Sequence, residues 1–288
     1  MIFSYTLFGD MKLSSAFQSK TPTVGVIIPI FNSGCEAIRA IRSVSAQVNV
    51  SVHEVVVVDD GSSDDSADLL RNACRDLSIP VRIISTSNGG AANARNHGML
   101  NCGSDLYAFL DSDDTWHNDK LERQLPFFSD PSVGMVGTLT TMGHSDAPRS
   151  DNSGVFRVIS PRQQLFKNFF QTSTVIVRRE VVEAVGPFPV NQRHAEEGDF
   201  FNRIAAHYKC ILISQVLVDY GGGKQGFGAS GLSANLIAME KGELRNIWRV
   251  YSRGDCGFGL MAVAISYSLI KFARRILITS LRRLGKNV

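Results

Sequence analysis

The stretch Val24-Gly-Val-Ile-Ile-Pro-Ile30, followed at once by Phe31-Asn32-Ser33-Gly34, predicts a buried β-strand that ends in a polar loop. Three more short runs of β-branched or aromatic residues, at 54–58, 81–85 and 106–110, have the same character. The four runs begin 30, 27 and 25 residues apart, and the segments between them carry apolar residues at helical spacing. This alternation predicts an α/β fold with a Rossmann-like, mostly parallel sheet and helices on both faces.

A polar cluster follows each of the four predicted strands. The clusters are Phe31–Gly34, Asp59–Asp64, Ser87–Gly90 with Arg95 one helical turn further on, and Asp111–Trp116. Ligands of open α/β sheets bind beyond the carboxyl ends of the strands. We therefore expect the four clusters to form one site at one edge of the sheet.

The segment Asp111-Ser-Asp-Asp114 crowds three carboxylates at a strand end. Like charges at this spacing repel one another unless a cation lies among them. Oxygen ligands of this kind suit Mg²⁺ or Mn²⁺, which also bind substrate phosphates. The alternative is a turn with an N-cap for a helix that begins near Asp119.

The Asp59-Asp60-Gly61-Ser62 segment has two interpretations as well. It is either a turn and helix cap, or a base-binding site in which a carboxylate accepts the imide N–H of uracil or thymine. Arg95 is either a solvated arginine or a bidentate contact for an acidic ligand. A base acceptor, a cation site and an arginine together match a nucleoside diphosphate.

The pattern loosens from Pro126 onward, where Gly134, Gly137 and Gly143 predict loops. Regular structure then returns. The sequence predicts a strand at 172–177, helices at 179–185 and 196–207, a strand at 210–220, a glycine-rich loop at 221–231 and a helix at 232–252. We divide the chain into a leader (1–20), a main domain (21–235, with two halves, 21–116 and 117–235) and C-terminal helices with a basic tail (236–288).

Five stretches in the same order and spacing make the chain resemble a family 2 glycosyltransferase with the GT-A fold, of the bacterial surface-polysaccharide type. These stretches are residues 26–32, 57–64, 88–96, 109–125 and 186–188. The resemblance implies an enzyme that moves a sugar from a nucleotide donor to an acceptor hydroxyl and inverts the anomeric centre. It also implies that residues 21–235 form a GT-A catalytic domain, with a nucleotide-binding half (21–116) and an acceptor half (117–235).

The resemblance assigns roles on the donor side. Pro29 and Phe31 would lie along the base, Asp60 would accept the base N–H, and Arg95 would contact the base or ribose side. UDP is favoured over other carriers because Asp60 suits an imide base. Apart from the resemblance, the glycine density of 221–231 indicates a loop that would bring Lys224 over the donor phosphate or the acceptor. The alternative is a plain surface loop.

Asp111 and Asp113 match the first and last carboxylates of the family's DxD motif, and Asp114 follows directly. The resemblance divides the ribose contact and the metal ligands among these positions. Asp113 is favoured for the sugar or ribose, Asp114 as the more direct metal ligand, and Mn²⁺ or Mg²⁺ as the cation.

The segment 194–201, His-Ala-Glu-Glu-Gly-Asp-Phe-Phe, resembles the family's Glu-Asp-x-Asp segment at a helix start. Glu197 would be the catalytic base and Glu196 a substrate contact, although Glu197 stands where the family usually has aspartate. The alternative is an acidic first helical turn favoured by the helix dipole. The sequence 226–231 also spells GxGxxG, but no second strand follows to complete a dinucleotide-binding unit.

Two other function classes remain open at this point. One is a haloacid dehalogenase-like phosphatase, whose nucleophile also lies in an Asp-x-Asp after a strand; there the motif normally opens the domain, whereas here three strand–helix units precede it. The other is a sugar-nucleotide-binding protein without catalysis, because of the glutamate at 197.

Charge is unevenly distributed along the chain. The net charge is +3, yet residues 271–288 hold six basic side chains and no acid, which leaves the body near −3. This pattern argues against nucleic-acid binding and predicts that the tail, 259–286, lies on an anionic membrane as an amphipathic helix. The alternative is a C-terminal helix packed on the domain. A glycan or lipid-linked acceptor, and a cytoplasmic location at the inner face of the cell membrane, follow as expectations; the oligomeric state stays open.

Overall fold

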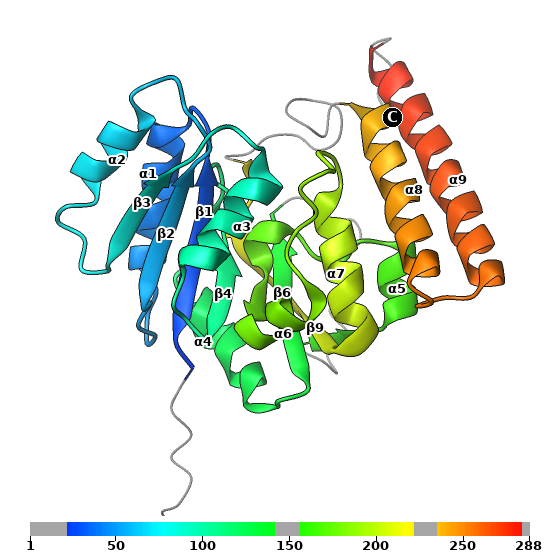
Figure 1. Ribbon diagram of the computed structural model, residues 1–288, viewed down its shortest axis with the longest axis horizontal. Helices are drawn as coiled ribbons and strands as arrows, with labels where there is room; N and C mark the ends of the chain where they lie inside the picture. Colours follow the sequence, from blue (N-terminus) through cyan, green and yellow to red (C-terminus); the bar gives the residue numbers. More distant parts are fainter. Residues whose placement is uncertain (1–21, 142–155, 222–234, 284–288) are drawn as a thin grey trace, which may run out of the picture.

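The computed structural model describes residues 22–141, 156–221 and 235–283. Within these ranges the strands form a nine-stranded sheet in the order β3-β2-β1-β4-β8-β6-β9-β5, and β7 pairs with β9 (Figure 1). The strands are β1 (Val24–Ile30), β2 (Glu54–Asp59), β3 (Val81–Ser85), β4 (Leu106–Phe109), β5 (Thr115–Trp116), β6 (Val133–Thr140), β7 (Phe156–Ile159), β8 (Ile176–Arg178) and β9 (Lys209–Asp219). The α-helices are α1 (Gly34–Ser45), α2 (Ser66–Ala73), α3 (Ala91–Asn101), α4 (Lys120–Gln124), α5 (Pro161–Phe166), α6 (Arg179–Val185), α7 (Glu196–His207), α8 (Leu236–Ser252) and α9 (Phe258–Arg283), with 3₁₀ turns η1 (Leu125–Ser129) and η3 (Thr172–Thr174).

The first half of the sheet is parallel, as the sequence predicts. β1 pairs in parallel with β2 and β4, and β2 pairs in parallel with β3. β1 rises from the grey N-terminal trace at the bottom of Figure 1, so the carboxyl ends of these four strands lie at the top. Beyond β4 the sheet is mixed, because β8 runs antiparallel to both β4 and β6 while β9 is parallel to β6.

Both faces of the sheet are buried, which explains the unbroken apolar runs of β1 and β2. Side chains alternate between two cores: Ile28 and Val57 point to one, Ile27 and Val56 to the other. The first core is covered by α1 and α2, and the second by α3, α6 and α7. Strands buried on both faces carry continuous β-branched residues instead of alternating ones. The predicted α/β class with helices on both faces is confirmed.

The prediction of loops from residue 126 to 153 was wrong for residues 133–140, which form the central strand β6. Its glycines are packing positions and not turn signals. A Cβ on Gly134 would lie 2.6 Å from Tyr208 Cβ, and one on Gly137 would lie 2.5 Å from the Phe170 ring. Glycine inside a strand marks such close approaches, and the aromatic residues that require it are distant in sequence.

The predicted strand at 172–177 is only partly a strand. Residues Thr172–Thr174 form the turn η3, and strand β8 begins at Ile176. The Thr174 hydroxyl donates to the carbonyl of Gln171 at 2.7 Å, the kind of local hydrogen bond with which Ser and Thr compete against regular structure. The helix predicted at 232–252 is observed from Leu236 to Ser252. Most of the predicted glycine-rich loop lies outside the described residues, and so does the predicted leader 1–20.

The C-terminal helices α8 and α9 pack side by side at the right of Figure 1, next to α7. A third apolar cluster joins them to α5 through Leu165, Ile247, Val250, Met261 and Ala264. Across the described ranges, none of the helices combines the length and the apolar character needed to span a membrane.

Candidate active site

Asp60 anchors the loop at the end of β2. The side chain is buried, its Oδ1 accepts the backbone N–H of Gly89 at 2.8 Å, and its Oδ2 accepts that of Gly90 at 2.7 Å. Gly90 has a φ of 86°, which glycine adopts without steric cost. Asp60 N–H in turn donates to Ile30 O at 2.9 Å. The carboxylate of Asp60 therefore joins the loops after β2 and β3, and its backbone N–H attaches them to the end of β1.

The predicted base-side residues lie beside this carboxylate. Pro29 is buried within β1, opposite Val58, and Phe31 is 51% exposed just past the strand end. Asn32, which has a φ of 49°, fixes the two loops to each other because its N–H donates to Ser62 Oγ at 2.9 Å. Phe31 thus offers an exposed aromatic surface on a held backbone.

Arg95 is the central cation of the site. It projects from α3 and is only 4% exposed; its Nη2 lies 2.7 Å from Asp111 Oδ1 and its Nη1 lies 3.2 Å from Glu196 Oε1. Burial by itself lowers the pKa of Arg95, but the charges of Asp111 and Glu196 outweigh it and hold the pKa above its ordinary value. Its Nε is buried without a hydrogen-bond partner among the described residues. Arg95 thereby joins segments that are distant in sequence.

Asp114 faces the protein interior. It is 1% exposed, and its Oδ2 accepts the Ser173 hydroxyl at 2.5 Å while its Oδ1 accepts the N–H of Gly221 at 2.6 Å. Burial, together with the charge of Asp111, raises the pKa of Asp114 to about 7. Asp111 and Asp113 are partly exposed, and the N–H of Asp111 donates to Ser173 Oγ at 3.0 Å.

The donor set fits a hard cation shared with a substrate. In the part of the chain that the structure describes, there is no group of three or more His, Cys, Asp or Glu side chains arranged to hold a metal ion by itself. Mg²⁺ and Mn²⁺ need fewer protein ligands when phosphates and water complete the shell. Burial first, and then the nearby charge of Asp111, raise the pKa of Asp114, and a cation bound beside these carboxylates would offset both effects.

Glu196 and Glu197 begin α7 and lie beside Arg95. Glu196 is buried in the ion pair with Arg95, whereas Glu197 is partly exposed. Burial and the charge of Glu196 raise the pKa of Glu197 to about 7, although Arg95 opposes the rise. A carboxylate with a pKa near neutrality accepts a proton efficiently at neutral pH.

The structure therefore brings Arg95, Asp111, Asp114, Glu196 and Glu197 together, through Ser173 and the Arg95 ion pairs. Pro29 lies near the end of β1, and Phe31 and Asp60 directly follow the neighbouring strands β1 and β2, at the same edge of the sheet. Lys224 lies outside the described residues.

Sequence reasoning missed Ser173, whose hydroxyl joins Asp111 to Asp114. A serine among the polar residues 171–174 gives no local signal of such a role. A cavity of about 430 Å³, lined by residues such as Val52, His53 and Pro80, lies at the opposite edge and holds none of the predicted site residues.

Comparison with known proteins shows the family to which the chain belongs. The family model described as "Glycosyl transferase family 2" matches residues 25–186. A glycosyltransferase of Haemophilus influenzae is 31% identical over 201 residues, which cover 67% of this chain and 76% of that one. The amylovoran biosynthesis glycosyltransferase AmsB of Erwinia amylovora is 25% identical over 218 residues, 70% of each chain. The chain belongs to glycosyl transferase family 2 and is a glycosyltransferase, as predicted. With other relatives the match is shorter; it covers 57% of the length of AglE from Haloferax volcanii.

Solved structures show the same fold. The mannosyltransferase PcManGT of Pyrobaculum calidifontis, in complex with GDP-Man and Mn²⁺, has a TM-score of 0.66 at 18% identity, covering 92% of this chain and 81% of that one. S. aureus TarS 1-349, in complex with UDP-GlcNAc, has a TM-score of 0.64 at 17% identity, covering 86% of this chain and 71% of that one. The predicted GT-A fold is confirmed.

Proposed function

We propose that this glycosyltransferase moves a sugar from a UDP-sugar to an acceptor hydroxyl with inversion, assisted by a divalent cation, in the synthesis of a surface polysaccharide. One observation carries the proposal: Arg95 holds Asp111 of the donor-side motif against the first turn of α7, where Glu197 lies. Carboxylates for a cation and a carboxylate for proton transfer thus share one edge of the sheet. AmsB, named for amylovoran biosynthesis, supports the polysaccharide assignment.

On the donor side, Phe31 and Pro29 would pack against the base and Asp60 would accept its imide N–H. TarS in complex with UDP-GlcNAc supports a UDP-sugar, while PcManGT with GDP-Man shows that the fold also serves another base. Arg95, whose Nη atoms are both paired, would act through Asp111 and Glu196 more than by direct contact with the ribose. Lys224 remains a proposed contact to the phosphates.

For the cation, Mn²⁺ or Mg²⁺, the inward hydrogen bonds of Asp114 favour Asp113 as the direct ligand. Asp114 would instead fix the loop through Ser173 and Gly221. PcManGT in complex with Mn²⁺ supports the use of a metal by this fold. When bound, the cation would neutralise the charge that develops on the departing diphosphate.

The residues of the chain would perform the remaining chemistry. Glu197 would take the proton of the acceptor hydroxyl as that oxygen bonds to the anomeric carbon, on the face opposite the diphosphate. The bond between the anomeric carbon and the diphosphate oxygen breaks, and its electron pair leaves with UDP. Glu196, held by Arg95, would keep the first turn of α7 in place for this attack.

A thermal-shift panel with UDP-GlcNAc, UDP-glucose, UDP-galactose, dTDP-glucose and GDP-mannose, each with Mn²⁺ or with EDTA, tests the proposal. We expect a UDP-sugar to raise Tm only with Mn²⁺, and the shift to shrink in Asp113→Asn. UDP release from that donor should disappear in Glu197→Gln while the thermal shift remains. Equal shifts in EDTA would refute the metal, and UDP release unchanged in Glu197→Gln would leave a donor-binding protein without this chemistry.

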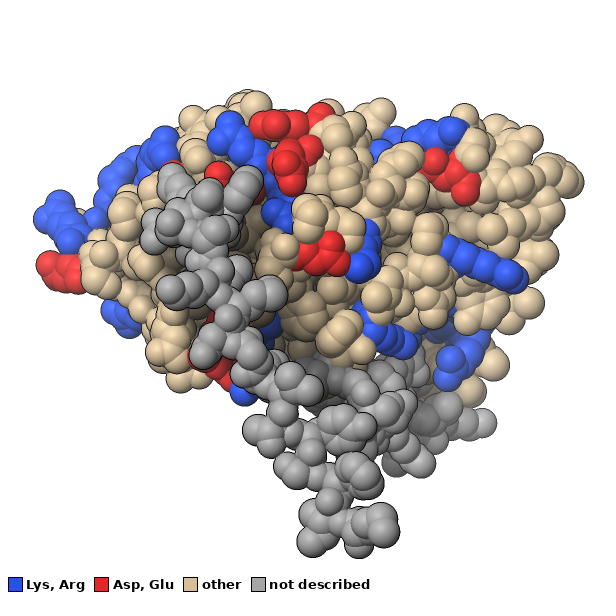
Figure 2. All heavy atoms as spheres, turned by 90° about the horizontal axis from the view of Figure 1, so that it is seen from below, with Lys and Arg blue, Asp and Glu red and all other residues tan. Residues whose placement is uncertain are grey.

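We also propose that α9 lies on the membrane surface, but through an apolar face. Val263, Ile270 and Leu277, seven residues apart, are 57%, 67% and 60% exposed. Two of the basic residues on which the expected contact with an anionic membrane rests, Lys271 and Arg275, turn inward to Glu243 of α8 at 3.5 and 2.8 Å. At the right of Figure 2, on the side where α8 and α9 lie, the surface is mostly tan with small groups of charges.

An outward apolar stripe suits the interfacial region of a bilayer and a lipid-linked acceptor at the inner face of the membrane. Co-sedimentation with vesicles of phosphatidylcholine and phosphatidylglycerol tests this. Wild type should sediment with the vesicles and Ile270→Glu should not, whereas Glu36→Gln, on α1, should behave as wild type. Wild-type protein that stays in the supernatant would refute the proposal.

A further inference from the structure

The segment before α7 packs directly against the backbone of α8. Gly242 lies in α8 where a Cβ would clash with the carbonyl oxygen of His194 and would come within 3.2 Å of Ala195 Cβ. Glycine is unfavourable inside a helix, so this close approach explains its presence. Helix α8 thereby contacts the two residues that precede Glu196 and Glu197.

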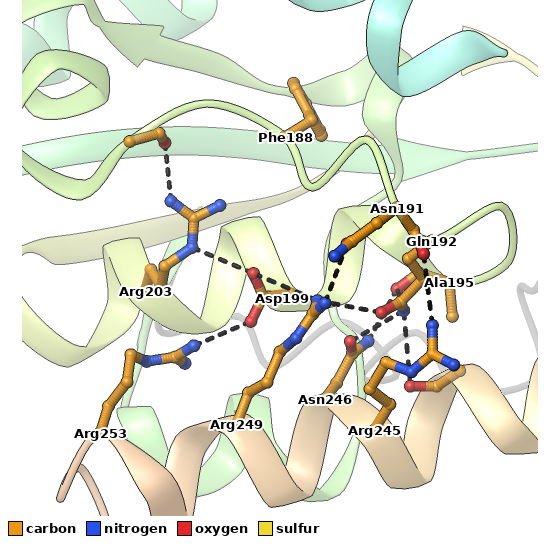
Figure 3. A network of polar contacts seen from close by, with 12 residues as sticks. Phe188, Asn191, Gln192, Ala195, Asp199, Arg203, Arg245, Asn246, Arg249 and Arg253 are labelled. Carbon is orange, nitrogen blue, oxygen red and sulfur yellow. Dashed lines mark hydrogen bonds and ion pairs between the residues drawn. The ribbon is translucent and has the colours of Figure 1, made fainter. Parts of the chain in front are cut away.

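Two buried amide side chains fasten this contact (Figure 3). Asn246 Nδ2 donates to Ala195 O at 2.7 Å, and Gln192 Nε2 lies 3.0 Å from His194 O and 3.2 Å from Ala195 O. The two amides also bond to each other, from Gln192 Nε2 to Asn246 Oδ1 at 2.9 Å. Arg249 Nη1 donates to Gln192 Oε1 at 3.0 Å, which fixes the orientation of that amide.

Ala195 needs such support because its backbone is left-handed, with φ 55° and ψ 30°. Residues with a Cβ rarely adopt this conformation. Ala195 is the N-cap of α7, so its conformation sets the direction in which the helix begins. The direction of Glu197, two residues later, depends on it.

A second attachment follows Glu197. Asp199 is buried among three arginines: Arg203 of α7 at 3.1 Å, and Arg253 at 2.8 Å and Arg249 at 3.8 Å, both from the C-terminal side of the chain (Figure 3). Arg203 also donates to the carbonyls of Gly186 and Pro187. The α8 region therefore holds the chain on both sides of Glu197.

We propose that Gly242, Asn246 and Gln192 are positioning residues for Glu197: they hold the left-handed turn at Ala195 and so aim the base at the acceptor. The inference rests on the proposed role of Glu197. Displacing a reacting group by about 1 Å costs about a hundredfold in rate. The residues proposed to contact the base, Phe31 and Asp60, follow β1 and β2, and the proposed cation ligand Asp113 follows β4. None of these three residues lies on α8, so the KM for the donor should change little.

The test compares Gly242→Ala with Gly259→Ala, the same substitution in α9, where a Cβ would meet nothing within 4 Å. UDP release is measured with Mn²⁺ and the UDP-sugar that gives the largest thermal shift, and kcat is expressed per folded protein from urea unfolding. Gly242→Ala should lower kcat about ten- to a hundredfold with KM for the donor within about twofold. Gly259→Ala should match wild type.

Asn246→Asp provides a second variant of nearly unchanged size, in which an acceptor replaces the donor that faces Ala195 O; the same fall in kcat at constant KM is expected. Glu197→Gln is assayed in parallel. If Glu197→Gln loses activity while Gly242→Ala and Asn246→Asp keep the wild-type kcat, the positioning inference is wrong and the proposed function stands. Full activity in Glu197→Gln would overturn both.

Discussion

Replacing Asp114 with asparagine should stabilise the cation-free protein, and more so as the pH rises. The carboxylate is buried beside Asp111, and its pKa is raised from 3.8 to about 7. Asparagine has the same shape: its oxygen can accept the N–H of Gly221, while its NH₂ would donate to Ser173 Oγ and so reverse the hydrogen bond in which the Ser173 hydroxyl donates to Asp114. The substitution therefore removes the buried charge and costs the Ser173 hydroxyl proton its acceptor, a smaller effect.

The sign and size follow from proton linkage. Between pH 3.8, the pKa of an unperturbed aspartate, and about pH 7, the pKa of Asp114 in the folded protein, the native state binds a proton that the unfolded chain releases. The free energy of unfolding of the wild type therefore falls as the pH rises through this range. At 1.36 kcal/mol for each pKa unit, the raised pKa of Asp114 lowers the free energy of unfolding by about 1–2 kcal/mol at pH 5 and by about 4 kcal/mol at pH 8. We expect Asp114→Asn to gain about 2–4 kcal/mol at pH 8 and about half as much or less at pH 5.

Urea unfolding in EDTA at pH 5 and pH 8, followed by tryptophan fluorescence, measures both values; Trp116 is buried near the site. Asp68→Asn serves as the control, because the Asp68 side chain is 78% exposed on α2 and should show no such gain. Equal stability of Asp114→Asn and wild type at pH 8, or an equal gain at both pH values, would refute the reasoning.

Three further outcomes are expected. In wild type, kcat/KM should rise with pH to a plateau with a midpoint near 7, because burial raises the pKa of Glu197 to about 7 and the base must be ionised. Glu197→Gln should lose about 10²–10⁴-fold in kcat. A wild-type kcat/KM that stays constant from acid to alkaline pH would contradict the assignment of Glu197 as the base. Arg95→Met removes the cation between two carboxylates and should lower the free energy of unfolding by about 3–5 kcal/mol in urea titration; a loss below about 1 kcal/mol would mean that the pair is not buried in solution. Gly137→Ala places a methyl group 2.5 Å from the Phe170 ring and should cost about 1–3 kcal/mol, whereas Gly257→Ala, with nothing within 4 Å, should not.

The strands of the first half could be predicted because their signals are local. Val24–Ile30 and Val81–Ser85 are bounded as predicted, since β-branched runs end at polar turns. β6 could not be found in this way: the glycines that read as loop signals are required by Tyr208 and Phe170, which follow in the sequence by more than 30 residues. A glycine in the sequence indicates that a side chain does not fit at that position, but it does not indicate which distant residue occupies the space.

The same distinction applies to the candidate site. Asp60 and Asp111 were predictable because they follow strands, and parallel strands end at one edge. Ser173 and Asn246 were not, since each acts on a residue more than 50 positions away. The inward turn of Lys271 was hidden for the same reason, because its partner Glu243 lies on another helix.

The close approach of Gly242 to the backbone of His194 limits which segments of this protein can be exchanged with those of a relative. A chimaera that takes α8 and α9 from a relative, in order to redirect the enzyme to another acceptor, would bring a foreign side chain against residues 191–195. Such a graft must keep glycine at this point or import the matching loop from the same parent. The crossover therefore belongs before residue 191 and not at the apparent boundary near residue 235.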